Sequence, residues 1–294
     1  YHLFNGSTGI PLEIQPGGRV KLHLQWDDPY TAASNDFDLF IHDLQSDSDV
    51  AIGNKVQTGE ERPYEKIDYQ NVGDKVQKAE VRIRAKEGKG QGSHLELLLE
   101  TDATRVVVGK EYLTPDDSII GWAALPNVIS VAALSAQNQK IQDFSSQGTV
   151  TIAYPVPDVR EKPEITGVDG VSVTGAGDFP TPFTGTSAAA PHIAGLLALV
   201  KSLYPTVPNT ELRDALLNSA TDLGTPGWDA IYGYGLADAL SLHAYLQEAG
   251  RTPEVPGTNQ TPLIPDIIIP SEQLPPNEFI LTEPAVLSKP GSYI

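Results

Sequence analysis

The chain has 294 residues, which leaves room for two domains of the usual ~100 to 200 residues each. Its 38 acidic side chains outnumber 20 basic ones, and the net charge of -18 argues against nucleic acid and anionic membrane surfaces as partners. Cysteine is absent, so disulfides and thiolate chemistry are excluded, and no apolar run approaches the ~20 residues that a bilayer-spanning helix needs.

Residues 12–112 show the alternation of apolar and polar side chains that is typical of half-buried β-strands. Every second residue of RVKLHLQW (19–26) is apolar, and DFDLFI, EVRIRA and HLELLLE repeat the alternation. Turn-rich stretches such as QPGG and KEGKGQG separate these segments, and no helical pattern occurs among them. We therefore predict an all-β sandwich domain over residues 12–112.

The stretch QWDDPYTAASNDFDLFIHD, within this domain, concentrates four aspartates: Asp27, Asp28, Asp36 and Asp38. Because calcium takes six to eight oxygen ligands, carboxylates from two neighbouring segments could supply several of them, and we predict a calcium site here. The alternative is that the turns of an acidic protein collect aspartate without binding an ion. Zinc is not expected, since cysteine and paired histidines are missing. Asp116 and Asp117 in TPDDS are expected to form a turn.

The pattern changes after Ser118. Apolar strands are followed by helices expected near 187–203, 209–222 and 235–249, which indicates an α/β arrangement with a largely parallel sheet. Pro208 and Asn209 mark the start of the second of these helices, and Gly224 follows its end.

The segment FTGTSAAAPHIAGLLALV (183–200) opens the first of these helices. Its apolar residues occupy every face, so we expect burial all round. Proline is tolerated in the first turn, where N–H groups have no acceptor in the helix, so Pro191 is expected to fix the helix start. That places Ser187 at the N-cap or first helical position. A serine there is ordinarily only a cap, but Gly185 allows a tight turn and the helix N-terminus offers positive potential to an oxyanion.

The segment GTSAAAPHIAG (185–195) resembles the nucleophile motif of the subtilisin-like serine proteases. Further stretches are similar to flanking segments of that family in the same order: NVISVAAL (127–134), DFSSQG (143–148), KPEITGVDGVSV (162–173) and YGYGLADAL (232–240). The resemblance implies a parallel-sheet α/β domain over residues 113–250 and a serine endopeptidase in which Ser187 is the catalytic nucleophile. Gly185, Thr186, Pro191 and His192 are then residues that support the motif.

The family orders its catalytic residues Asp, His, Ser, with an oxyanion asparagine between His and Ser. No segment upstream of Ser187 resembles the Asp, His or Asn motif. His192 lies five residues along the same helix, so we expect it to pack and not to act as the base. The other histidines lack a catalytic context, with His23 and His94 expected on strands and His243 in a late helix; His2 and His42 complete the set.

The chain contains no methionine and begins at Tyr1, so we expect it to be the carboxy-terminal part of a longer precursor. Residues 1–11 would connect it to an upstream catalytic half, as a segment of the same chain or as a companion fragment left by proteolytic processing. The sandwich resembles, more weakly, the bacterial pre-peptidase C-terminal domains that some members carry as insertions. The resemblance also implies secretion and a protein or peptide substrate. A catalytically inactive scaffold, acting through its sandwich and tail, stays open as the alternative.

Residues 251–294 are rich in proline and lack a helical period, so we predict an extended tail. The runs LIPDIII and FILTEPAVL are apolar enough to lie along a surface of this protein or of a partner. A disordered linker is the alternative.

Overall fold

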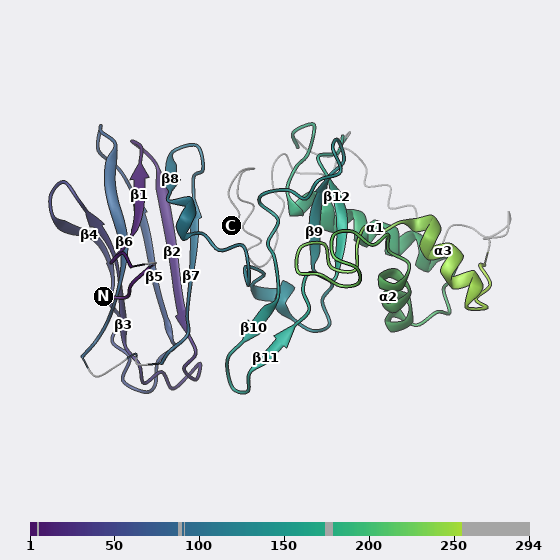
Figure 1. Ribbon diagram of the computed structural model, residues 1–294, viewed down its shortest axis with the longest axis horizontal. Coiled ribbons are helices and arrows are strands. Elements are labelled where there is room, and N and C mark those ends of the chain that lie inside the picture. Colours follow the sequence, from purple (N-terminus) through teal and green to yellow (C-terminus); the bar gives the residue numbers. More distant parts are fainter. Residues whose placement is uncertain (5, 88–89, 91, 174–178, 255–294) are drawn as a thin grey trace, which may run out of the picture.

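The structure is a computed structural model that describes residues 1–254, apart from 5, 88–89, 91 and 174–178. Figure 1 shows an elongated molecule with strands β1 to β8 at one end and the helices at the other. The predicted proline-rich tail lies outside the described residues except for 251–254.

Eight strands lie in the described part of the amino-terminal half. They are β1 (Ile10–Ile14), β2 (Arg19–Trp26), β3 (Phe37–Asp43), β4 (Ser48–Gly53), β5 (Tyr64–Gln70), β6 (Gln77–Ala85), β7 (Leu95–Thr101) and β8 (Val106–Val108). They form a five-stranded sheet of order β4-β3-β6-β1-β8 and a three-stranded sheet of order β5-β2-β7. Every neighbouring pair is antiparallel.

One hydrophobic core lies between the two sheets, and the alternation of β2 shows how the sequence builds it. Val20, Leu22, Leu24 and Trp26 are buried, while the residues between them are exposed or half-buried. They pack with the inward residues of both sheets in a single cluster. The region predicted as a sandwich therefore folds as two antiparallel sheets over a shared core.

The predicted limits of this region need correction. β1 begins at Ile10, inside the stretch expected to be a connection, and the His2 amide already donates to the Ile83 carbonyl oxygen over 2.8 Å. A short 3-10 helix, η1 (Lys110–Tyr112), lies at the end of a region in which no helix was expected. Asp116 and Asp117 form the predicted turn.

The carboxy-terminal half has little sheet among the residues that the structure describes. β9 (Val131–Ser135) and β12 (Ile165–Asp169) pair in parallel, while β10 (Val150–Ile152) and β11 (Asp158–Arg160) form an antiparallel pair. A second 3-10 helix, η2 (Gly121–Ala124), precedes them. The expected parallel sheet is thus represented by one ladder of two strands, extended by a parallel bridge between Thr166 and Leu236.

The described residues of this half also form three α-helices: α1 (Thr186–Leu203), α2 (Asn209–Asn218) and α3 (Ala239–Glu248). α2 starts after Pro208 as predicted, but it ends four residues earlier than expected and α3 starts four residues later. One pairing explains both differences. The Thr221 and Leu236 backbones exchange hydrogen bonds of 2.9 and 2.8 Å, which holds both segments in extended conformation. No helix in the described ranges is long and apolar enough to cross a membrane.

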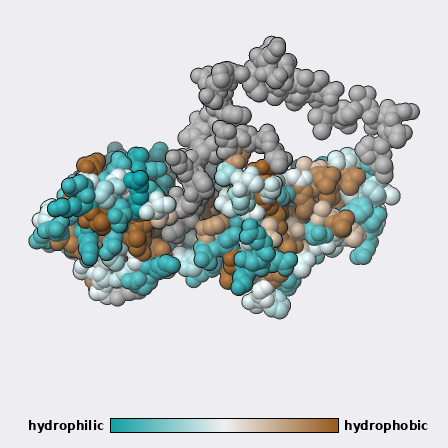
Figure 2. Space-filling view, turned by 90° about the horizontal axis from the view of Figure 1, so that it is seen from above, coloured by the Kyte–Doolittle hydropathy of each residue, from teal (hydrophilic) through white to brown (hydrophobic). Residues whose placement is uncertain are grey.

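The prediction that α1 is buried all round is wrong. Its buried residues are Ala188, Ala189, Ile193 and Val200, and the helix packs against β9 and β12. Its opposite face exposes apolar residues at helical spacing: Ala190, Ala194, Ala198 and Leu199. Figure 2 shows hydrophobic surface in the helical part of the molecule, at the right of the view. We call these four residues the exposed stripe of α1.

Truncation of Leu24 to alanine tests the core of the two sheets. Leu24 is fully buried, so Leu24→Ala removes buried apolar surface and leaves a cavity. We expect the free energy of unfolding to fall by about 2 to 5 kcal/mol, measured by urea denaturation. The matched control is Val72→Ala, because Val72 is 91% exposed and its truncation leaves stability nearly unchanged. Equal losses in the two variants would contradict the shared core.

The start of α3 provides a pH-dependent test. The Asp238 carboxylate accepts a hydrogen bond of 2.7 Å from the Ser241 amide, and this bond is the main cause that lowers the pKa of Asp238. A pKa lowered by folding stabilises the protein above the unfolded value of about 3.9, and the gain is lost as pH falls through the folded value. Asp238→Ala should therefore cost about 1 kcal/mol at pH 7. Urea denaturation at pH 7 and pH 3 should show this difference shrinking in acid; a constant difference would contradict the capping role.

Candidate active site

The turn before α1 places Ser187 at the surface. Gly185 is the N-cap with φ of 115° and ψ of 163°, a conformation that L side chains rarely adopt. Its carbonyl oxygen accepts hydrogen bonds from the Ala188 and Ala189 amides, at 2.8 and 3.3 Å, and these close the first helical turn. Thr186 and Ser187 are the first two helical residues, so Ser187 lies one position later than predicted.

A buried carboxylate holds this turn in place. Asp169, at the end of β12, is fully buried, and its Oδ1 accepts a hydrogen bond of 2.6 Å from the Gly185 amide. Its Oδ2 accepts another, of 2.7 Å, from Gln142 Nε2. The turn before Ser187 is therefore anchored to the carboxyl end of a parallel strand.

Gly167 sets the distance between β12 and α1. A Cβ atom at this position would lie 2.7 Å from the Ala189 carbonyl oxygen and 3.2 Å from a side-chain carbon of Ile193. Glycine therefore permits a close approach of strand and helix that a larger residue would prevent.

Ser187 lies at the N-terminus of α1, which is the positive end of the helix. Ser187 is exposed, and its hydroxyl forms no hydrogen bond with any residue in the described part of the chain. The helix dipole and the unpaired amide groups of the first turn favour negative charge at this end. An anion forming beside Ser187 would thus be stabilised by backbone groups.

Pro191 does not mark the start of the helix. It is the sixth residue of α1, beyond the first turn in which it was expected. Because proline has no N–H, the Ser187 carbonyl oxygen lacks the hydrogen bond that the residue four positions later normally gives. The helix thus carries a local gap in its backbone bonding directly behind the serine.

None of the six histidines, all of which are described, hydrogen-bonds to Ser187. His192 Nδ1 lies 2.8 Å from the Ala188 carbonyl oxygen and its side chain is exposed, so the expected packing role is wrong. His243 lies on α3 and contacts the Tyr204 hydroxyl, at 2.8 Å. His23 is on β2 as expected, whereas His94 comes just before β7 and not on it. His42 contacts Asp47 and Asp49, and His2 packs on Phe4.

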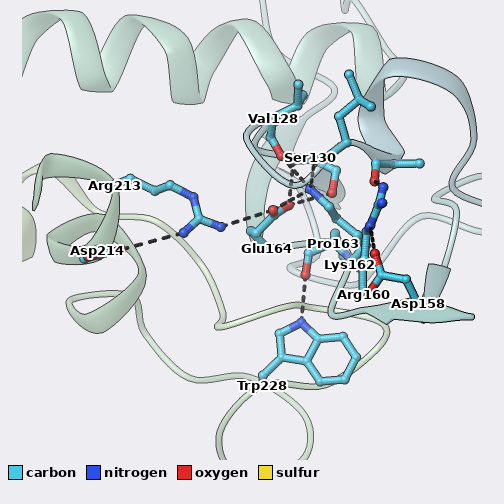
Figure 3. A network of polar contacts seen from close by, with 12 residues as sticks. Val128, Ser130, Asp158, Arg160, Lys162, Pro163, Glu164, Arg213, Asp214 and Trp228 are labelled. Carbon is cyan, nitrogen blue, oxygen red and sulfur yellow. Dashed lines mark hydrogen bonds and ion pairs between the residues drawn. The ribbon is translucent and has the colours of Figure 1, made fainter. Parts of the chain in front are cut away.

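A buried ion pair supports the two strands beneath α1 (Figure 3). The Lys162 and Glu164 side chains are almost fully buried, and Lys162 Nζ lies 2.5 Å from Glu164 Oε1. The ammonium also donates to the carbonyl oxygens of Leu125 and Val128. The second Glu164 oxygen accepts from the Ser130 amide and hydroxyl, at 2.8 and 2.7 Å. Ser130 and Glu164 directly precede β9 and β12, so this network fixes where both strands begin.

Residues of α2 and of the loop that follows it also contact the network of Lys162 and Glu164. Arg213, on α2, approaches Glu164 Oε1 at 3.3 Å, and Trp228 Nε1 donates to the Pro163 carbonyl oxygen over 2.9 Å (Figure 3). Burial is the main cause that raises the pKa of Tyr234, whose backbone amide donates to the Glu164 carbonyl oxygen.

The four aspartates predicted to bind calcium do not gather at one point. Among the described residues, no three of them place carboxylate oxygens close enough to share an ion. Asp28 accepts hydrogen bonds from the Ser34 and Asn35 amides and so shapes its own loop. Asp38 is fully buried and paired with Arg84 and Lys86, at 2.8 and 3.0 Å.

Asp36 lies in the same buried acidic region as Asp38. Burial raises the pKa of nearby Glu65, a hydrogen bond from Gln57 offsets part of this, and the Asp38 and Asp36 carboxylates raise it further. Asp27 accepts a hydrogen bond from the His94 amide instead, at 3.1 Å. The prediction of a calcium site at these residues therefore stays a prediction.

Sequence reasoning did not find Asp169, Gln142 or Gly167, although they position the serine turn. The available signal was an acidic residue placed directly after the apolar run of β12, since charged groups at a strand end near a helix N-terminus often serve a site. Nothing in the local sequence indicates that its partner is the Gly185 amide, sixteen residues away.

Replacement of Asp169 tests this anchor. Asp169→Ala leaves the Gly185 amide and the Gln142 side chain without their acceptor, and we expect a loss of stability of about 1 to 3 kcal/mol in chemical denaturation. Asp214→Ala is the matched control, because the Asp214 side chain is 66% exposed and contacts Arg213 only at 3.7 Å. Its loss should stay within about 0.5 kcal/mol. Similar values for the two variants would mean that Asp169 anchors nothing.

Comparison with known proteins places this geometry in context. Residues 104–235 match the model of the subtilase family. The chain is 38% identical over 117 residues to a thermostable alkaline protease of Halalkalibacterium halodurans, covering 40% of this chain and 28% of that protein. It is 33% identical over 129 residues to a subtilisin of Bacillus pumilus, covering 44% of this chain and 42% of that protein.

A third relative is the minor extracellular protease Epr of Bacillus subtilis, which is 32% identical over 114 residues, or 39% of this chain and 16% of that protein. The chain thus spans less than half the length of each of these relatives. The segment that the family model matches, residues 104–235, contains β9 to β12, the serine turn, α1 and α2.

Proposed function

We propose that this chain, whose residues 104–235 are a segment of the subtilase family, carries the nucleophile of a secreted serine endopeptidase. The observation that carries the proposal is the exposed Ser187 hydroxyl at the N-terminus of α1, within a turn held by Asp169. A nucleophile must reach its substrate, and this placement supports access from solvent.

In the proposed reaction, Ser187 Oγ attacks the carbonyl carbon of a peptide bond and gives its proton to a histidine. The tetrahedral oxyanion forms near the positive end of α1, the C–N bond breaks, and the amine leaves with the proton from the histidine. Water then hydrolyses the acyl-enzyme. The histidine, its aspartate and the oxyanion asparagine are supplied by a segment outside these 294 residues, because none of the six histidines contacts Ser187.

The exposed stripe of α1 supports an upstream segment of the same protein as the missing partner. A helix with alanine at three successive positions of one face allows a close approach by another backbone, and burial of that face would be favourable. We propose that this segment lies on the stripe, either as part of one polypeptide or as a companion fragment after processing.

Secretion is proposed from the relatives, one of which is named as an extracellular protease. Calcium stays a proposal for the loop of Asp27 and Asp28, because Asp38 is already neutralised by two basic side chains. The inserted-domain origin of the two-sheet half is proposed on the sequence resemblance alone.

A catalytically inactive scaffold is the second candidate. It is favoured by the absence of a histidine contact to Ser187 in this chain and by the large two-sheet half that presents its own surfaces. In this case the serine would be retained as a helix-turn residue without a base.

Labelling with a fluorophosphonate probe separates the two candidates. Such probes react with an activated serine, and an unassisted hydroxyl reacts poorly. We expect the isolated 294-residue chain to label at a rate at least a thousandfold below that of the native protein isolated from its source, since loss of the base costs several orders of magnitude. Ser187→Ala should abolish labelling of the native protein, while Ser202→Ala, on the same helix, should leave it unchanged. A folded native protein that does not label would support the scaffold.

A further inference from the structure

Three residues converge at the junction between the two halves of the molecule, and only Asp117 lies within the segment that the family model matches. His94 precedes β7, Glu96 is the second residue of β7, and Asp117 lies in the turn that leads toward η2. One ligand atom from each of them lies within 4.8 Å of the other two. This is the only such group of three among the described residues, and its members come from two separate segments of the chain.

Hydrogen bonds already hold the backbone and side chains that carry these three ligand atoms. Gln25 Nε2 donates to Glu96 Oε2, the Thr151 amide donates to Asp117 Oδ1 over 2.9 Å, and the His94 amide donates to Asp27 over 3.1 Å. These bonds use only one oxygen of Glu96 and one of Asp117. The second Glu96 oxygen faces His94 Nε2 at 4.0 Å, so each of the three side chains keeps one donor atom for a ligand.

The negative charge around His94, Glu96 and Asp117 favours binding of a cation. Glu96 and Asp117 form no ion pair with any lysine or arginine in the described ranges, and Asp27 and Asp28 line the same pocket of about 600 Å³. Arg62, the one lysine or arginine among the described residues that line this pocket, lies over the Tyr30 ring with its guanidinium carbon 4.8 Å from the ring centre. Two carboxylates held this close repel each other unless a positive charge lies between them.

The donor set selects the class of ion. Calcium and magnesium prefer oxygen ligands alone, whereas an imidazole nitrogen together with two carboxylate oxygens suits zinc and related transition metals. Four-coordinate zinc binds nitrogen at about 2.0–2.1 Å and carboxylate oxygen at about 2.0–2.2 Å, which places neighbouring ligand atoms about 3.4 Å apart. The three ligand atoms lie within 4.8 Å of one another, so zinc binding requires side-chain rotations that bring them closer together. The sequence argument against zinc counted cysteines and paired histidines, and it missed a set that forms only when β7 meets the 116–117 turn.

We propose that His94, Glu96 and Asp117 bind one divalent transition-metal ion of the zinc class, with solvent completing its coordination. The ion joins the β5-β2-β7 sheet to the turn that leads into the subtilase segment. It therefore acts as a clamp between the two halves and takes no part in the chemistry at Ser187.

Titration of the metal-free chain with Zn²⁺ tests the site, with binding followed by calorimetry and stability by thermal unfolding. We expect one equivalent to bind and to raise the Tm, since an ion bound only to the folded state stabilises it. His94→Ala, Glu96→Gln and Asp117→Asn should each weaken binding at least tenfold and remove the rise in Tm. Asparagine suits position 117 because Asp117 has a φ of 55°, which asparagine tolerates well.

The control variant is Glu248→Gln, an exposed carboxylate at the end of α3, which should bind Zn²⁺ like the parent chain. Circular dichroism of each apo variant establishes that it is folded. No binding by the parent chain, unchanged binding by the folded His94→Ala variant, or Ca²⁺ binding as tight as Zn²⁺ at this site would each overturn the proposal. These outcomes are independent of whether Ser187 is catalytic.

Discussion

The buried pair of Lys162 and Glu164 is the constraint on which the carboxy-terminal half depends. Removing two charges from water is costly, and the pair persists because every charged atom has partners: two carbonyl oxygens for the ammonium, and Ser130 for the carboxylate. The pair therefore specifies one arrangement of the chain around it. A segment that moved away would leave a charge buried without a partner.

The buried pair influences the position of Ser187 through strands β9 and β12. Ser130 and Glu164 fix the starts of β9 and β12, and the parallel register aligns Ile165 with Val131 through to Asp169 with Ser135. At the far end of this ladder Asp169 holds the Gly185 amide, and along it Gly167 admits α1 at close range. A rigid network at one end of the strands thus positions a surface hydroxyl at the other.

A feature of the fold can be predicted from the sequence when a short stretch of residues determines it. The alternation in β2 and the start of α2 after Pro208 are local, and the structure agrees with both. The limits of α2 and α3 depend on pairing between Thr221 and Leu236, which no short window contains. The helix at Ser187 was predicted from its apolar residues and Pro191, yet its exposed face could not be, because apolar residues do not indicate whether anything in the same chain covers them.

The candidate site also contains residues that the local sequence reveals and residues that it does not. Ser187 and Gly185 are recognisable from residue type and spacing, whereas Asp169 and the group of His94, Glu96 and Asp117 depend on contacts between distant segments. Pro191 shows that the preference of proline for the first helical turn does not by itself locate the start of a helix. Pro191 is the sixth residue of α1, beyond the first turn that proline prefers.

The exposed stripe of α1 lies on a molecule of net charge -18, and the two features oppose each other. Like charge keeps copies of the chain apart at long range, while alanine and leucine side chains attract only on contact. Salt shortens the reach of the repulsion to about 10 Å at 0.1 M and leaves the apolar attraction in place. Where the stripe is uncovered, ionic strength thereby governs whether two such stripes can meet.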